Sequence, residues 1–148
     1  PVDETSIPYG RIDHVEGTPM DFREPHVVGD RIDADHEQTK FGVGYDHCWV
    51  LNKREPGELS FAAKCVEPNS GRVIECYTTE PGVQVYTGNF LDGTVKGKKG
   101  IVYQQRASVC LETQHYPDSP NKPHWPSVVL EPGKTYKSHC IFKFGIEK

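Results

Sequence analysis

The sequence contains no apolar run that approaches the roughly 20 residues needed for a membrane-spanning helix. Its first residues also lack the basic stretch followed by an apolar stretch that marks a secretory signal peptide. The formal net charge is only −4, and the one dense basic stretch is Lys96-Gly97-Lys98-Lys99. Because binding to phosphates needs clustered Lys and Arg, we expect a soluble chain with neither nucleic acid nor a membrane as a partner.

Paired cysteines and metal-binding spacings are also missing. The five cysteines are an odd number with no C-x-x-C pair, and none of the seven histidines forms an H-x-x-x-H or H-E-x-x-H pattern. This usage favours free thiols, a reducing cytoplasmic setting and no metal site. Gly-x-Ser-x-Gly and phosphate-loop patterns are absent too, which argues against a nucleophile elbow and a nucleotide cradle.

Turn-forming residues are abundant, with 14 Gly and 12 Pro. Both residue types interrupt helices, so we expect short strands joined by tight loops. The first forty residues are typical of ordered loops with one short strand or helical turn. Later segments alternate apolar and polar residues or are rich in strand formers, namely 48–52, 59–65, 72–79, 83–87, 108–115 and 136–144. The sequence therefore predicts an all-β fold in a single unit spanning residues 1–148.

Two local patterns sharpen this prediction. Residues 68–71, Pro-Asn-Ser-Gly, separate two strand segments and predict a hairpin. In the last segment, even-numbered side chains would share one side of the strand. We expect this side to face a core, because it carries Tyr136, Cys140, Phe142 and Phe144.

Glu112 lies in the middle of the predicted strand 108–115. On a strand, Cys110, Glu112 and Gln114 point to one face. Burying an ionised carboxylate without partners is costly, so Glu112 is either a hydrogen-bonded structural group or part of a site that lines a cleft. The residues alone leave both readings open.

Two further polar segments could contribute to binding. Asp46 follows the glycine-flexed loop Gly42-Val43-Gly44-Tyr45, and loops at the end of a sheet often carry binding residues. The alternative is a turn in which the Asp46 carboxylate caps backbone amides. Gln84 lies in the predicted strand 83–87, where it is either an amide that contacts a ligand or an ordinary exposed strand residue.

Long motifs in this region resemble one known family. Residues 79–93, Thr-Glu-Pro-Gly-Val-Gln-Val-Tyr-Thr-Gly-Asn-Phe-Leu-Asp-Gly, and residues 110–118, Cys-Leu-Glu-Thr-Gln-His-Tyr-Pro-Asp, closely resemble segments of the aldose 1-epimerase family. Segments 1–10, 17–23, 44–47 and 126–133 resemble family segments in family order. The resemblance covers essentially the whole chain and corresponds to the C-terminal half of a family member.

The resemblance implies a fold and an activity. Family members are β-supersandwiches that interconvert the α and β anomers of free aldohexoses, typically galactose and glucose, without a cofactor. This chain would form an antiparallel β-sandwich as part of that fold. Carried over by motif, Glu112 would be the general base. Asp46 and Gln84 would hold sugar hydroxyls or the ring oxygen.

The chain also departs from the family pattern. The acid histidine, a second sugar-binding histidine and an arginine of the family lie upstream of the segment that Pro1-Val2-Asp3-Glu4 resembles. We therefore expect a missing N-terminal half or a second chain as a partner. The alternatives are a non-catalytic sugar-binding or interaction module derived from the same fold, and a purely structural β domain.

Overall fold

The computed structural model describes residues 1–147. The chain divides into two compact units. Unit 1 comprises Pro1–His47 and Val85–Cys110, and unit 2 comprises Cys48–Gln84 and the residues from Leu111 onward. The elements, in chain order, are α1 (Val28–Arg31), α2 (Glu37–Gly42), β1 (Asp46–Val50), β2 (Ser60–Glu67), β3 (Arg72–Thr78), β4 (Gly82–Tyr86), η1 (Lys98–Gly100), β5 (Cys110–Gln114), η2 (Ser119–Asn121) and β6 (Cys140–Ile146).

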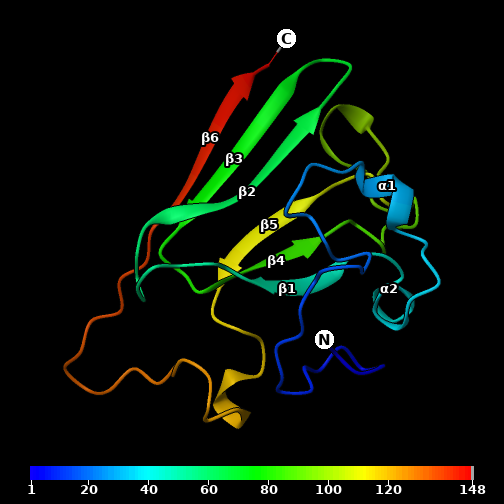
Figure 1. Ribbon diagram of the computed structural model, residues 1–148. Coiled ribbons are helices and arrows are strands. Elements are labelled where there is room, and N and C mark those ends of the chain that lie inside the picture. Colours follow the sequence, from blue (N-terminus) through cyan, green and yellow to red (C-terminus); the bar gives the residue numbers. More distant parts are fainter. Residues whose placement is uncertain (148) are drawn as a thin grey trace. The chain divides into compact units, whose positions relative to one another are not determined.

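Unit 2 contains a three-stranded antiparallel sheet with the order β2-β3-β6 (Figure 1). The β2–β3 hairpin is held at its turn by Glu67, whose carboxylate accepts hydrogen bonds from the amides of Asn69 and Ser70 at 2.9 and 2.8 Å. Gly71 completes the turn with a φ of +69°, a backbone conformation that residues other than glycine rarely adopt. The hairpin predicted from residues 68–71 is therefore present.

A second sheet has the strand order β1-β4-β5. The amide of Leu51 donates to the carbonyl of Pro81 at 3.0 Å, and the amide of Thr87 donates to the carbonyl of Tyr45 at 3.1 Å. The position in β1 rises as the position in β4 falls, so these two strands are antiparallel. The chain passes from one unit to the other within each of the three strands.

The core of unit 1 forms around Tyr45, which is 1% exposed. Its ring packs edge-on against Phe22 with the centroids 5.2 Å apart, and its hydroxyl donates to the carbonyl of Pro19 at 3.1 Å. Gln38 is also buried, and its amide pairs with the backbone N–H and carbonyl of Val2 at 2.7 and 2.8 Å. These contacts order the N-terminal segment, which has little regular secondary structure of its own.

The all-β prediction is confirmed, although residues 28–42 form two short helices instead of one turn. No helix within residues 1–147 is both long and apolar enough to cross a bilayer. Residues 128–130 form no strand, and the turn after them is closed by the amide of Lys134, which donates to the carbonyl of Glu131 at 3.0 Å.

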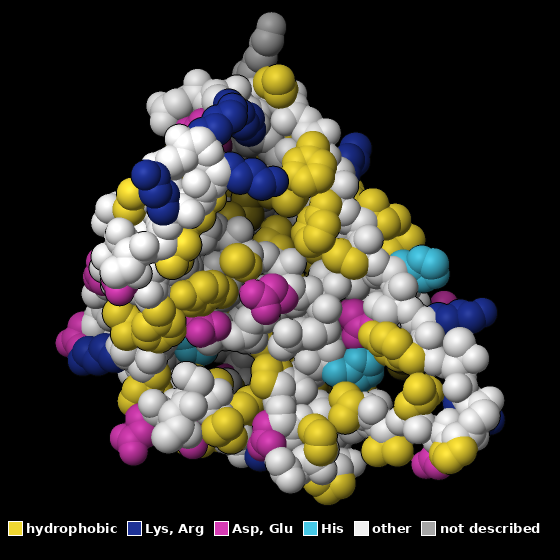
Figure 2. Space-filling model, turned by 180° about the vertical axis from the view of Figure 1, so that it is seen from behind, with side chains coloured by type: hydrophobic (Ala, Val, Ile, Leu, Met, Phe, Trp, Pro, Cys, Tyr) yellow, Lys and Arg dark blue, Asp and Glu magenta, His cyan; other side chains and the backbone are white. Residues whose placement is uncertain are grey.

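One expectation about the core is wrong. Cys140, Phe142 and Phe144 share one side of β6, as their parity predicts, but the whole of β6 is exposed. Phe142 is 42% exposed, Phe144 is 75% exposed, and Tyr136 lies before the strand and is 60% exposed. The register places Phe142 opposite Cys76 and Phe144 opposite Ile74, so these side chains form an apolar face of the β2-β3-β6 sheet. Figure 2 shows hydrophobic side chains at the surface in this part of the molecule.

Candidate functional site

Gln84 and Glu112 lie on the same face of the β1-β4-β5 sheet, as the contacts of the Cys48 side chain indicate. A Cβ atom at Gly82 would lie 2.8 Å from the Cys48 sulfur, so Gly82 and Cys48 face the same side. Gln84 follows two positions later in β4 and points the same way. The Gln114 side chain also hydrogen-bonds to the Cys48 thiol, so Gln114 lies on this side too. Glu112 precedes Gln114 by two positions in β5 and shares its orientation.

The Cys48 thiol is a packing group on this face. Burial raises its pKa to about 11, and the hydrogen bond from Gln114 opposes this shift only in part. Gly82 leaves the space that the sulfur and the Tyr116 ring occupy, since an added Cβ would also lie 3.2 Å from the Tyr116 ring. A neutral, packed thiol of this kind fixes the spacing of the strands and takes no part in acid–base chemistry near neutral pH.

The Glu112 side chain is exposed in the middle of β5, between half-buried and buried neighbours. An exposed carboxylate on a regular strand can be reached by a polar ligand from solvent. It therefore has the accessibility that a general base requires. An ordinary strand carboxylate on a solvent face would be exposed in the same way, so the role of Glu112 stays a prediction.

Asp46 lies in unit 1 at the start of β1 and points to the same side of its strand as Cys48, two positions later. The segment that leads to Asp46 has a positive φ at two positions, +134° at Gly44, which glycine adopts readily, and +53° at Val43, where it strains a β-branched residue. That Asp46 meets the same ligand as Gln84 and Glu112 stays a prediction.

Asn89 holds the segment before Asp46 in place. Asn89 is 3% exposed, and its amide nitrogen donates to the carbonyls of Gly42 and Tyr45 at 2.8 and 2.9 Å. Its amide oxygen accepts from the Thr87 hydroxyl at 2.6 Å. A Cβ at position 44 would lie 2.5 Å from that oxygen, so glycine is required there for packing as well as for its φ.

A buried polar cluster in unit 2 was not predicted from the sequence. Glu80 is 4% exposed, and His115 Nδ1 lies 2.6 Å from one of its carboxylate oxygens. The Tyr136 hydroxyl donates to the other oxygen, and the Ser138 hydroxyl also donates to this carboxylate. The only signal in the sequence was that Glu80 and His115 fall within the two long motifs.

The charge of Glu80 is stabilised by these partners. Burial by itself raises the pKa of a carboxyl group, because the charged form loses its hydration. Here the hydrogen bonds from Ser138 and Tyr136, together with the nearby His115, outweigh burial and hold the pKa of Glu80 below its usual value. Glu80 is therefore ionised at neutral pH inside the unit.

The model of the family described as aldose 1-epimerase matches residues 1–143. The chain belongs to the aldose 1-epimerase family. It is 48% identical over 146 residues to the galactose mutarotase of Mus musculus, covering 99% of this chain and 41% of that protein. It is 36% identical over 146 residues to the aldose 1-epimerase of Escherichia coli, covering 97% of this chain and 41% of that protein.

Solved structures agree with this membership. An aldose epimerase homologue from C. elegans superposes with a TM-score of 0.86 at 29% identity, covering 100% of this chain and 43% of that one. A galactose 1-epimerase from Lactobacillus acidophilus superposes with a TM-score of 0.66 at 23% identity, over 100% of this chain and 41% of that one, and supports the fold alone. The resemblance seen in the sequence motifs is thus confirmed.

This family member spans about two fifths of the length of the curated relatives that it matches. Within residues 1–147 no group of three or more His, Cys, Asp or Glu side chains is arranged to hold a metal ion.

Proposed function

We propose that the protein containing this chain is an aldose 1-epimerase that interconverts the α and β anomers of galactose or glucose, and that this chain supplies the general base. The observation that carries the proposal is the common face of Gln84 and Glu112, an amide and an exposed carboxylate on adjacent strands of one sheet. Membership of the aldose 1-epimerase family supports the same chemistry.

In the proposed reaction, the Glu112 carboxylate takes the proton from the anomeric hydroxyl. The bond between the anomeric carbon and the ring oxygen then breaks, and the ring oxygen accepts a proton to give the open-chain aldehyde. Rotation about the first carbon–carbon bond and reclosure produce the other anomer. Gln84 and Asp46 would hold sugar hydroxyls or the ring oxygen, which keeps the anomeric hydroxyl within reach of Glu112.

The proton donor is proposed to come from outside this chain. The relatives are longer, since the chain covers 41% of each of them, so the remaining part can supply an acid histidine and an arginine.

We propose that this remaining part also covers the apolar face of β6. Exposed aromatic side chains such as Phe144 are unusual on a surface that faces only water. The five free thiols support a reducing, cytoplasmic location.

The test is the rate of galactose mutarotation, followed by optical rotation, in the intact protein that contains this chain. Replacing Glu112 with Gln keeps the shape of the side chain and removes the base, so the catalysed rate should fall about 10²–10⁴-fold. A matched control is Glu131→Gln, which changes an exposed carboxylate in the turn before β6. An unchanged rate in Glu112→Gln would refute the assignment.

A second measurement separates the enzyme from the sugar-binding module. Calorimetry with galactose should detect binding in Glu112→Gln even though turnover is lost. Binding without turnover in the unaltered intact protein would instead favour the non-catalytic module. The absence of both binding and turnover would favour a purely structural domain.

A further inference from the structure

Glu80 and His115 connect the two strands that carry the proposed site residues. Glu80 precedes the first residue of β4 by two positions, and His115 directly follows the last residue of β5. Their side chains meet at 2.6 Å although they lie 35 positions apart in the sequence. Gln84 and Glu112 each lie within four residues of one member of this pair, so the contact joins the two strands close to both residues.

The same carboxylate also anchors the chain before β6. Tyr136 and Ser138 both donate to Glu80, and they end a long segment that has no strand of its own. Thr79, next to Glu80, exchanges hydrogen bonds with the backbone of His139, at 3.0 Å through its amide and 2.9 Å through its hydroxyl. Glu80 is therefore the point at which the start of β4, the end of β5 and the approach to β6 are joined.

The backbone immediately before Glu80 is fixed as well. Thr78 is fully buried, and its hydroxyl accepts from the amide of Glu80 at 3.0 Å. The Lys53 ammonium donates to the carbonyl of Thr78 at 2.8 Å and to the hydroxyl of Ser60 at 2.8 Å. A buried carboxylate whose oxygens are all hydrogen-bonded and whose backbone is held in this way has one favoured position.

We propose that Glu80, acting through His115, is a positioning residue for epimerisation, because it fixes the ends of β4 and β5 and so sets the spacing between Gln84 and Glu112. The proposal rests on the proposed function and adds a residue that touches no substrate. A buried carboxylate with fully satisfied hydrogen bonds restricts geometry, and placement of the base against the anomeric hydroxyl is a matter of geometry.

The expected effect falls on turnover more than on binding. In Glu80→Gln the neutral amide still fills the space, but its NH2 group cannot accept a hydrogen bond, so the contact with His115 or with Tyr136 is lost in its present form. A small displacement of a catalytic group can lower a rate by about 100-fold. We expect kcat to fall about 10–100-fold with KM changed less than about threefold, since sugar contacts remain.

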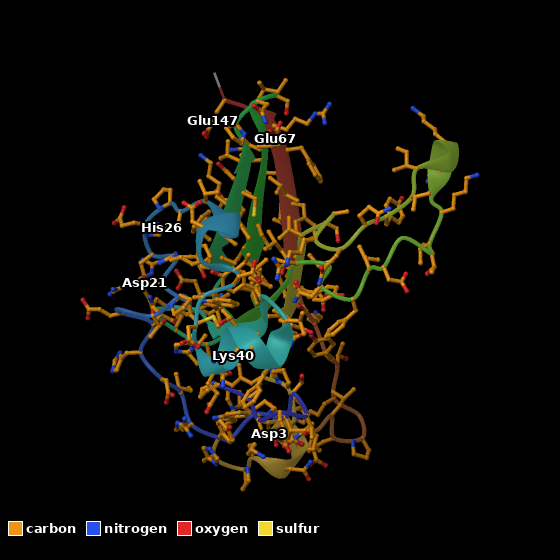
Figure 3. All side chains as sticks on the ribbon, turned by 90° about the vertical axis from the view of Figure 1, so that its right-hand side faces the viewer. Asp3, Asp21, His26, Lys40, Glu67 and Glu147 are labelled. Carbon is orange, nitrogen blue, oxygen red and sulfur yellow. The ribbon has the colours of Figure 1, made fainter. Side chains whose placement is uncertain are left out.

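Glu67→Gln is the matched control. Glu67 is also a hydrogen-bonded carboxylate of unit 2, but it serves the β2–β3 turn. Figure 3 places it beside Glu147 at the end of the β2-β3-β6 sheet. The Glu67→Gln change should lower the melting temperature without changing kcat. All rates are measured well below the melting temperature of each variant in the intact protein, so that loss of fold cannot imitate loss of positioning.

Hydrogen exchange supplies a readout that is independent of catalysis. In Glu80→Gln, the peptide covering residues 110–116 should exchange faster, whereas in Glu67→Gln it should not. His115→Gln should produce the same change, and the double variant should add little to either single variant, because both residues act through one contact.

The outcomes separate the two proposals. If Glu112→Gln abolishes turnover while Glu80→Gln keeps full kcat and normal exchange in residues 110–116, the positioning role is wrong and the proposed function stands. If Glu112→Gln keeps full turnover, the proposed function fails, and faster exchange in Glu80→Gln then still establishes the link between the strand ends.

Discussion

The amide of Glu147 donates a hydrogen bond of 2.8 Å to the carbonyl oxygen of Gly71, which ties the end of β6 to the turn between β2 and β3. The approach is close because position 71 has no side chain. A Cβ there would lie 2.0 Å from the carbonyl oxygen of Glu147. The third strand of the sheet therefore depends on one glycine in a turn that lies outside its own strand.

Gly71→Ala should destabilise the protein by about 3 kcal/mol, from the left-handed backbone and the clash with Glu147 together. Gly57→Ala is the control, since Gly57 has a φ of +78° but nothing within 4 Å of an added Cβ. It should cost only about 1 kcal/mol. Urea unfolding of both variants gives the comparison, and equal losses would show that the contact with Glu147 contributes nothing.

Asn89→Ala tests the support of the Asp46 segment. The change leaves the carbonyl of Gly42 without its buried donor, whereas the carbonyl of Tyr45 keeps the Thr87 amide as a donor. We expect a loss of about 1–3 kcal/mol in the free energy of unfolding, the usual cost of one unsatisfied buried group. Asn121→Ala, which removes an exposed amide bonded to Asp118, should cost less than about 0.5 kcal/mol. Similar costs for the two variants would contradict the structural role of Asn89.

The strands were predictable because alternation of side chains is local. The structure has β4 at Gly82–Tyr86 and β5 at Cys110–Gln114, within about two residues of the expected segments 83–87 and 108–115. The common orientation of Cys110, Glu112 and Gln114 also follows from parity alone. The neighbour of each strand depends on long-range pairing, so the strand order β1-β4-β5 was not predictable from these patterns.

Burial and buried clusters were harder to predict. The parity of Phe142 and Phe144 was correct, but parity says only that two side chains share a face, and whether the face is covered depends on what packs against it. The Glu80 cluster escaped prediction because its partners His115 and Tyr136 lie 35 and 56 positions away. A lone Glu between two threonines and Pro-Gly carries no local sign of burial.

The thiols of the 148-residue chain should differ widely in reactivity. Cys76 has no exposed surface, and burial, with a smaller contribution from the neighbouring Cys140, raises the pKa of Cys76 to about 12. Cys140 is exposed at the start of β6. Since the thiolate is the reactive form, a pulse of iodoacetamide at pH 8 should label Cys140 at least about 100-fold faster than Cys76. Peptide mass spectrometry gives both rates, and in urea they should become equal.

The same pulse tests the proposed cover of β6. In the longer protein, Cys140 should be labelled more slowly than in the 148-residue chain, because the remaining part is proposed to pack on the face that Cys140 shares with Phe142. The labelling rate of Cys76 should be low in both proteins. If Cys140 is labelled at the same rate in the two proteins, the remaining part does not pack on this face of β6.

Lowering the pH should reduce the stability of the folded protein, because Glu67 becomes protonated. Hydrogen bonds from the Ser70 hydroxyl and from the amides of Asn69 and Ser70 lower the pKa of Glu67 from 4.5 to about 2. A carboxyl whose folded pKa is depressed stabilises the fold above its unfolded pKa, and this contribution is lost as the pH falls toward the folded pKa. The urea midpoint should therefore fall between pH 5 and pH 2.

Glu67→Gln removes this titration, so its urea midpoint should fall less steeply between pH 5 and pH 2 than that of the unaltered protein. Some slope should remain, because hydrogen bonds also lower the pKa of Asp21, to about 2, and that of Glu80. Glu24→Gln, a change at an exposed loop position, should keep the full slope. If Glu67→Gln and the unaltered protein lose stability in parallel over this range, the hydrogen bonds at the turn do not govern the acid response, and the remaining carboxylates must account for it.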